Sequence, residues 1–263
     1  MNIKVIVAHH KRYYLPEEPM YLSLHVGKIN KKEELGLIGD DTGENISEKN
    51  PMFCELTALY WGWKNLDVDY VGLAHYRRHF AMKRYFFPKD SSKKWSLLLN
   101  QKDAEKLLSE YDIILPYKRK YYIETLYSHY KNSHKIEDLN KTIKIIERDY
   151  PEYKQACAIV MNRRWAHMFN MFIMKKELCD AYCKWLFDIL FKLEKEVDLS
   201  SYSSFEARVF GRISELLLNV WIYKQNHKYT EVPVLFMEKQ NYIHKYGMFI
   251  LRKLRIAKVN ERY

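Results

Sequence analysis

The sequence has 263 residues, of which 48% are hydrophobic and 29% are charged, so it can form an ordinary core and lacks the composition of a disordered chain. Its 8 glycines and 7 prolines are too few for a collagen-like or low-complexity protein. The net charge of +11 favours an anionic partner, and charge alone does not distinguish nucleic acid, a phosphorylated substrate and anionic lipid.

The sequence contains neither a membrane-spanning nor a secretory pattern. No apolar run reaches the roughly 20 residues that cross a bilayer. The start, MNIKVIVAHHK, becomes polar too soon for a signal peptide. The 4 cysteines form no CxxC pair, and free thiols are usual in a reducing compartment. We therefore expect a cytoplasmic protein.

The first predicted elements are two strands and a helix. Residues 3–8 (IKVIVA) form a short β-branched run, typical of a buried parallel strand. Residues 12–50 contain turn-forming residues and no long periodic segment, which predicts a long loop. An Asn-Pro pair followed by apolar residues at helical spacing predicts a helix over 51–65, and residues 70–74 (YVGLA) form the second strand.

The same alternation continues to residue 236. We predict helices over about 101–110, from Pro151 onward, over 177–197 and over 213–223, and strands over 112–116, 168–174 and 231–236. Strands that alternate with helices indicate an α/β domain with a mainly parallel central sheet flanked by helices. We place this domain at 1–238 and a C-terminal extension at 239–263.

The extension combines basic and apolar residues. Its 25 positions include the stretch MFILRKLRIAKV, in which both kinds of side chain alternate irregularly. Such a segment suits an anionic membrane surface, and a helix that docks its apolar side on the domain is the alternative. The first interpretation places the protein peripherally on the inner face of the plasma membrane.

Basic clusters follow the first two predicted strands. His9, His10 and Lys11 end the first strand, and Arg77 and Arg78 follow the second. Ligands of parallel sheets bind beyond the carboxyl ends of the strands, and adjacent guanidiniums suit a diphosphate because each offers planar, permanently charged donors. Ion pairs with carboxylates of a neighbouring helix are the alternative for these arginines.

The patterns that could indicate a metal site are weak. His75 and His79 are four residues apart, but they follow a strand and have no accompanying carboxylate motif. Asp67 and Asp69 form an Asp-x-Asp pattern that precedes the second strand, whereas a cation site would follow it. We therefore interpret these aspartates as residues at the start of the strand, and the metal ligands stay unknown.

The commonest enzyme motifs are missing from the sequence. Walker A, GxGxxG, GxSxG and HExxH patterns do not occur, which removes the usual P-loop, dinucleotide, hydrolase and zinc-protease signatures. Basic residues alternate with tyrosines at 11–14 and 118–122, a pattern that can bind nucleic acid. Because no nucleic-acid module is recognisable, we expect no nucleic-acid partner, and nucleic-acid binding stays an alternative function.

Several strings together point to one family. They are GDDTGENIS at 39–47, CELTALYW at 54–61, DYVGLAHYRR at 69–78, FNMFIM at 169–174 and GRISE at 211–215. Over about residues 2–236 the chain resembles the bacterial capsular and exopolysaccharide glycosyltransferases long described as a domain of unknown function. Some members of that family are assigned as galactofuranosyltransferases. A member that has lost catalysis and acts as a scaffold of a polysaccharide assembly complex is a further alternative.

The resemblance implies a GT-A-like fold and a hexosyltransferase. The donor would be a UDP-linked sugar, galactofuranose being one candidate, and the acceptor a lipid-linked or free saccharide of a capsule, exopolysaccharide or lipopolysaccharide. The resemblance leaves open whether Mn²⁺ or Mg²⁺ is needed. It assigns nucleotide and diphosphate binding to His9, His10, Lys11, Asp40, Asp41, Arg77 and Arg78. Turn capping is the alternative for the two aspartates.

The resemblance also suggests residues for the reaction itself. Glu215 is the candidate catalytic base, because an inverting transfer needs a carboxylate to take the proton of the acceptor hydroxyl. An ion pair with Arg208 or Arg212 is the alternative. The candidates for contact with the sugar or the acceptor are His75, Asn170, His134 and Asp138. A hydrogen bond in the core is the alternative for Asn170, and solvated loop positions are the alternative for His134 and Asp138.

Overall fold

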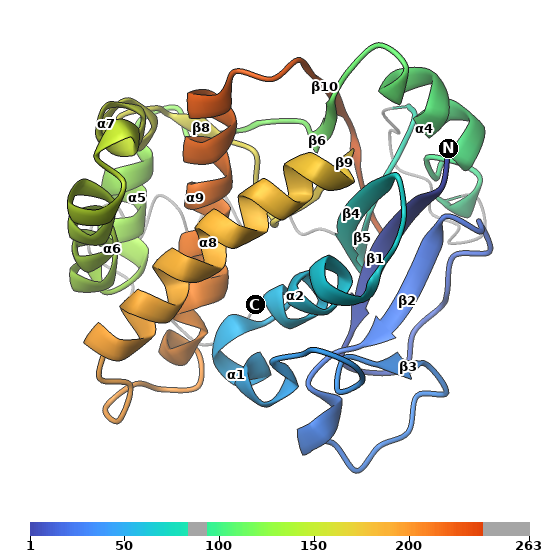
Figure 1. Ribbon diagram of the computed structural model, residues 1–263, viewed down its shortest axis with the longest axis horizontal. Helices are drawn as coiled ribbons and strands as arrows, with labels where there is room; N and C mark the ends of the chain where they lie inside the picture. The colour runs from blue at the N-terminus through green and yellow to red at the C-terminus, as the bar shows by residue number, and fades with distance from the viewer. Residues whose placement is uncertain (84–93, 239–263) are drawn as a thin grey trace.

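The computed structural model describes residues 1–83 and 94–238 (Figure 1). Its main sheet follows the order β10-β6-β9-β4-β1-β2-β3. These strands are β1 (Ile3–His9), β2 (Tyr21–His25), β3 (Ile38–Gly39), β4 (Tyr70–His75), β6 (Ile113–Pro116), β9 (Phe172–Lys175) and β10 (Tyr229–Val232). β1 pairs in parallel with β2 and β4, β2 with β3, and β6 with β10. β9 is antiparallel to both β4 and β6.

Helices cover both faces of this sheet. One face packs against α1 (Asn50–Phe53), α2 (Leu56–Asn65), α8 (Lys176–Glu196) and α9 (Val209–Gln225). The other packs against α4 (Gln101–Leu108) and lies next to the pair β5 (Arg78–Phe80) and β11 (Val234–Phe236). Alternate residues of β1 enter the two cores, Ile6 the first and Val5 and Val7 the second. The predicted α/β fold with a mainly parallel sheet flanked by helices is confirmed.

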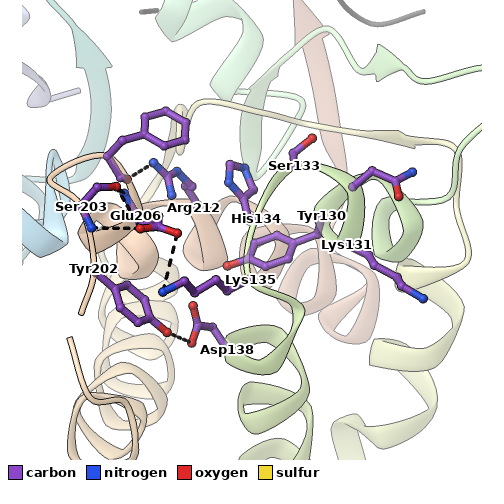
Figure 2. A pocket seen from close by; sticks show the side chains of 12 residues that line it. Tyr130, Lys131, Ser133, His134, Lys135, Asp138, Tyr202, Ser203, Glu206 and Arg212 are labelled. Carbon is purple, nitrogen blue, oxygen red and sulfur yellow. Dashed lines mark hydrogen bonds and ion pairs between the residues drawn. The ribbon is translucent and has the colours of Figure 1, made fainter. Parts of the chain in front are cut away.

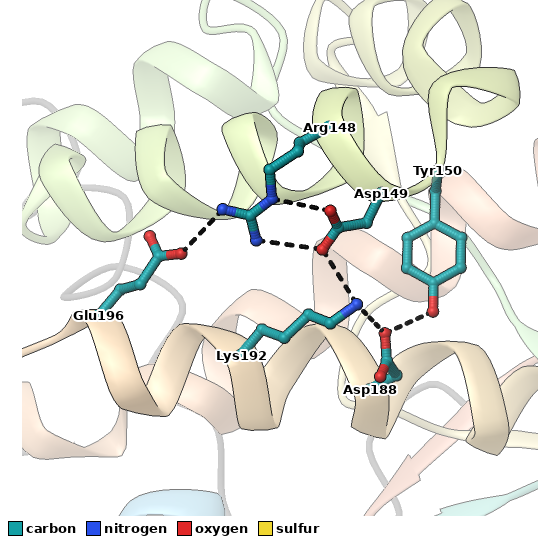
Figure 3. Close-up of polar contacts among 6 residues, drawn as sticks. All are labelled: Arg148, Asp149, Tyr150, Asp188, Lys192 and Glu196. Carbon is teal, nitrogen blue, oxygen red and sulfur yellow. Dashed lines mark hydrogen bonds and ion pairs between the residues drawn. The ribbon is translucent and has the colours of Figure 1, made fainter.

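A further helical layer lies outside α8 and α9 (Figure 1). It consists of α5 (Leu126–Ser133), α6 (Ile136–Asp149) and α7 (Lys154–Met161). A separate two-stranded ribbon, β7 (Arg119–Lys120) with β8 (Trp165–Ala166), connects this layer to the sheet domain. The end of α6 is joined to α8 by ion pairs from Asp149 to Lys192 and from Arg148 to Glu196 (Figure 3).

Several predicted elements differ from those in the structure. The predicted loop over 12–50 contains β2 and β3, and helices α5 and α6 occupy a stretch for which no element was predicted. The predicted helix over 51–65 is interrupted at Cys54, whose φ is 53°. The predicted strand over 168–174 begins only at Phe172, and the strand over 231–236 is two strands, β10 and β11.

Because β9 is antiparallel to β4, the turn that precedes β9 lies at the carboxyl end of β4. Leu73 near the end of β4 pairs with Phe172 at the start of β9. Gly72 permits the close approach of these strands, because a Cβ there would lie 2.8 Å from the Phe172 carbonyl oxygen. The turn at Phe169 and Asn170 therefore lies at the same edge of the sheet as the carboxyl ends of β1, β2 and β4.

The predicted extension over 239–263 lies outside the described residues, and the domain boundary at 238 stays a prediction. Within 1–83 and 94–238, no helix combines the length and the apolar character needed to cross a membrane.

Candidate functional site

A groove of about 480 Å³ opens beyond the carboxyl end of β1. Its lining combines aromatic, aliphatic and cationic side chains from two segments: His9, Lys11, Arg12, Tyr13 and Leu15 from the first, and Glu34, Leu35, Gly36 and Leu37 from the second. This volume falls in the range of about 300–1,000 Å³ that small-molecule sites occupy. The position agrees with the rule that ligands bind beyond the carboxyl ends of parallel strands.

His9 is the buried polar group of this groove. Its side chain is fully buried, and neither ring nitrogen has a hydrogen-bond partner within the described residues. Burial, together with the nearby His10 and His25, lowers the pKa of His9 to about 4. The imidazole is therefore neutral at pH 7 and offers one donor and one acceptor to a ligand.

Tyr76, at the rim of the groove, contacts several basic side chains. Its hydroxyl is 2.9 Å from His10 Nε2, and its ring centroid lies 5.6 Å from Lys11 Nζ and 5.0 Å from the Arg77 guanidinium carbon. Arg77 also forms an ion pair with Glu238 at 3.0 Å. Three of the predicted nucleotide-binding residues, His10, Lys11 and Arg77, thus lie around one aromatic ring.

Arg78 points to a different neighbourhood from Arg77. Its guanidinium carbon is 4.6 Å from the centroid of the Phe169 ring. Burial lowers the pKa of Arg78, and the negative charges of Glu215 and Glu55 act in the opposite direction. The two adjacent arginines therefore connect the cationic rim of the groove to a pair of carboxylates.

Glu55 and Glu215 form this carboxylate pair, on two different helical segments. Glu55 follows the break between α1 and α2, and Glu215 lies on α9. Burial first, and then the negative charge of Glu55, raises the pKa of Glu215 to about 7, while Arg78, Arg119 and a backbone hydrogen bond from Phe169 lower it. A carboxylate with a pKa near 7 can both take and give a proton at neutral pH.

Asn170 holds the two carboxylate-bearing segments together. The side chain is buried, and its Nδ2 donates to Glu55 Oε1 at 2.7 Å and to the Gly211 carbonyl at 2.9 Å. Ser214 Oγ donates to Asn170 Oδ1 at 2.9 Å. Asn170 therefore forms the hydrogen bonds in the core that were its alternative interpretation. The preceding residue, Phe169, is the one whose ring contacts Arg78.

Unusual backbone conformations surround the pair. Of the five non-glycine residues with positive φ in the described chain, three are Cys54, Phe169 and Asn170, with φ of 53°, 74° and 53°. Such conformations are costly for residues with a Cβ and gather at functional sites. His75 Nε2 lies 2.6 Å from the Phe169 carbonyl oxygen and so supports this strained turn from β4.

The two predicted aspartates of the loop have different surroundings. The Asp40 carboxylate is buried and accepts four hydrogen bonds of 2.5 to 3.2 Å, from the backbone of Gly27 and Lys28 and the hydroxyls of Ser47 and Thr57. Asp40 therefore has the turn-organising role that was its alternative. Asp41 is half-buried, and its carboxylate folds over Gly39, where a Cβ would lie 2.1 Å from Asp41 Oδ1.

His134 and Asp138 line a second cavity, also of about 480 Å³ (Figure 2). It lies where α5 meets α6, facing residues 202–206 and Arg212 on α9. Asp138 Oδ1 accepts a hydrogen bond of 2.8 Å from the Tyr202 hydroxyl. Both residues are at least half-buried, so they are not solvated loop positions.

The residues considered for metal binding are dispersed. Within the described part of the chain, no three His, Cys, Asp or Glu side chains are grouped as metal ligands. His79 is buried between the rings of Tyr21 and Trp95. Asp69 accepts a hydrogen bond of 2.7 Å from the Asn2 backbone at the start of β4, as expected of a residue at the start of the strand.

Glu55 and Tyr76 were absent from the residues predicted from the sequence. Tyr76 lies inside the string HYRR, directly before the two arginines, so its position was a usable signal. Glu55 lies inside the predicted helix, where a carboxylate is ordinarily a surface residue. The break in the helix at Cys54 directs Glu55 toward Glu215, and no sequence pattern predicts that break.

Comparison with known proteins gives one family and one solved structure. The family described as a domain of unknown function (DUF4422) matches residues 4–228. The apo structure of the WbbM bifunctional glycosyltransferase is similar, with a TM-score of 0.83 and 34% sequence identity. The similarity covers 91% of this chain and 46% of that chain, so this chain spans about half of the solved relative. No protein of curated function is significantly similar.

Proposed function

The chain belongs to the DUF4422 family, and we propose that it is a glycosyltransferase that moves a hexose from a UDP-linked donor to a saccharide acceptor, free or lipid-linked. The 34% identity to the WbbM bifunctional glycosyltransferase supports this class. The observation that carries the proposal is the junction of a cationic groove with the carboxylate pair Glu55 and Glu215 at one edge of the sheet.

The nucleotide of the donor occupies the groove beyond β1 in this proposal. The aliphatic and aromatic lining receives the base and ribose, and His9 supplies the unpartnered donor and acceptor. The diphosphate lies at the rim, against Lys11, His10 and Arg77, and replaces Glu238 as the partner of the Arg77 guanidinium. Charge-assisted hydrogen bonds from Arg and Lys are the strongest that a protein offers to phosphate oxygens.

The sugar then lies between the diphosphate and the carboxylate pair. The acceptor hydroxyl oxygen attacks the anomeric carbon, the bond from that carbon to the phosphate oxygen breaks, and Glu215 takes the hydroxyl proton. Arg78 stands between the two sites and stabilises the negative charge that grows on the departing UDP. Asp41 and His75, at the same edge of the sheet, are the next residues proposed to contact the donor.

Several finer assignments rest on the resemblance of the sequence. They are the GT-A-like fold class, galactofuranose as the hexose, and a role in building a capsular, exopolysaccharide or lipopolysaccharide chain at the cytoplasmic face of the membrane. Fixed cations can stabilise a departing diphosphate, and so can a divalent metal. In this proposal Lys11 and Arg77 at the rim, together with Arg78 beside Phe169, supply that positive charge.

A thermal-shift screen tests this proposal. A ligand that binds only the folded state raises the apparent melting temperature. We expect UDP and UDP-sugars to raise it, in contrast to the matching adenosine nucleotides, and the comparison is repeated with and without Mn²⁺. Stabilisation by oligonucleotides in place of UDP would favour the nucleic-acid alternative, and binding of UDP-sugars without any transfer would favour the scaffold.

A further inference from the structure

The cavity at the junction of α5 and α6, which we name the α5–α6 cavity, begins one helical turn from Glu215. Arg212 lines the cavity and precedes Glu215 by three residues on α9. Residues three apart lie on the same face of a helix, about 4.5 Å apart along its axis. A molecule whose reacting group is at Glu215 can therefore extend directly into this cavity.

Three aromatic side chains, Tyr130, Tyr202 and Phe205, contribute to the otherwise mainly polar walls of the α5–α6 cavity. Tyr130 and Phe205 flank the His134 ring, with centroids 5.0 and 6.1 Å from it. Tyr202 lies on the side of the cavity next to Asp138 of α6 (Figure 2). Phe205 and Tyr202 are half-buried and so partly accessible to a ligand. The negative face of an aromatic ring attracts the C–H groups on the face of a sugar ring.

Two of the three cations that line the cavity, Lys135 and Arg212, already have partners within the chain. Lys135 lies 3.6 Å from Glu206 and 3.5 Å from the centroid of the Tyr202 ring. Arg212 donates a hydrogen bond to the Phe205 carbonyl and stacks on the Phe205 ring at 4.1 Å. An anionic ligand would have to displace these contacts in order to bind Lys135 or Arg212. An uncharged ligand with many hydroxyls can add hydrogen bonds to the same groups without breaking the pairs.

We propose that the α5–α6 cavity is the binding site for the sugar rings of the acceptor, with the face of the Phe205 ring opposite Arg212 as the stacking platform and the reactive hydroxyl directed along α9 to Glu215. This assignment rests on the proposed transferase function. It also separates the two substrates in space, because the donor groove lies beyond β1 and the acceptor cavity lies on the helical layer.

Saturation-transfer NMR on the full chain tests the assignment without any need for turnover. The probes are methyl β-galactopyranoside, methyl α-glucopyranoside and methyl α-mannopyranoside, each with UDP present. Phe205→Ala removes the platform, and Ser133→Trp fills the cavity from the end of α5. Tyr223→Ala is the matched control, because Tyr223 stacks with Arg163 at 4.4 Å near the other end of the same helix.

We expect at least one glycoside to receive saturation from the wild type and from Tyr223→Ala, and the signal to fall at least tenfold in both cavity variants. UDP affinity, measured on the same proteins, should stay within twofold of the wild type. Unchanged glycoside signals in Phe205→Ala and Ser133→Trp would overturn the assignment, as would the lack of any glycoside signal in the wild type. A wild type that binds a glycoside in the cavity and fails to bind UDP would instead contradict the proposed donor.

Discussion

The side-chain amide of Asn170 donates a hydrogen bond to the Glu55 carboxylate at 2.7 Å, although 115 residues separate them in the chain. Asn170 belongs to the turn before β9, and Glu55 follows the break between α1 and α2. This contact fixes the second carboxylate of the site beside Glu215. Glu55 is therefore a positioning residue whose charge acts on the proposed base.

Glu55→Gln should change the protonation of Glu215 and leave the local geometry intact. The new amide oxygen can still accept from Asn170, but the negative charge that raises the pKa of Glu215 is gone. We expect the pH at the midpoint of the acidic limb of the activity–pH profile to fall below its wild-type value, which we expect near 7. Glu196→Gln, in the ion-pair network of Figure 3, is the control and should leave the midpoint in place. An unchanged midpoint in Glu55→Gln would show that the two carboxylates act independently.

Glu215→Gln should abolish most turnover without loss of donor binding. Removal of a general base commonly lowers the rate by about 10²-fold or more, because the proton of the acceptor hydroxyl then has no acceptor. The measurements are the rate of UDP release and the affinity for UDP on the same preparation. A Glu215→Gln protein with wild-type turnover would move the base to another carboxylate, with Glu55 and Asp41 as the next to test.

The raised pKa of Glu215 also predicts how stability depends on pH. The unfolded carboxyl group ionises at about 4.5 and the folded one at about 7, so between these values the folded protein holds the extra proton. The contribution of this group to the free energy of unfolding therefore falls as the pH rises through that window. Urea denaturation of wild type and Glu215→Gln at pH 5 and pH 8 measures the difference. We expect the variant to lose less stability than the wild type across this interval, and equal losses would contradict the assignment.

The tail prediction concerns residues 239–263. Each Lys or Arg near an anionic bilayer contributes about 1 kcal/mol, and salt screens that attraction. We expect the full chain to co-sediment with anionic liposomes at low salt, to be released at high salt, and to lose binding on truncation after residue 239. A truncated protein that is less stable, with no liposome binding by the full chain, would instead indicate a docked helix. Binding that persists after truncation would place the membrane contact on the domain.

The sequence predicted those features that depend on local pattern. The strands at 3–8 and 70–74 are short apolar runs and the helix over 177–197 has a clear helical period, and the structure contains β1, β4 and α8 at these places. The basic residues after the strands were found because topology alone brings strand ends together. β2 was missed because its alternating residues, YLSLH, lie in a stretch otherwise rich in turn-forming residues.

The parts that could not be predicted depend on long-range contacts. The left-handed residues at Cys54, Phe169 and Asn170 have no glycine to mark them, and tertiary hydrogen bonds stabilise them. The sequence pattern alone predicts one continuous helix around Glu55 and one continuous strand for FNMFIM. The same limit applies to the divergence of Arg77 and Arg78, because adjacent residues reveal their separate neighbours only in the folded chain.

Calorimetric titration with UDP tests the central claim most directly. We predict that wild type binds UDP and that Arg77→Ala and Arg78→Ala each weaken binding by about 1.5 to 3 kcal/mol, the scale of charge-assisted hydrogen bonds to a ligand. Circular dichroism should show an intact fold in both. Arg148→Ala removes an exposed guanidinium from the network of Figure 3 and should bind UDP as the wild type does. A wild type that fails to bind UDP, or arginine variants that bind it equally well, would contradict a donor site at the ends of β1 and β4.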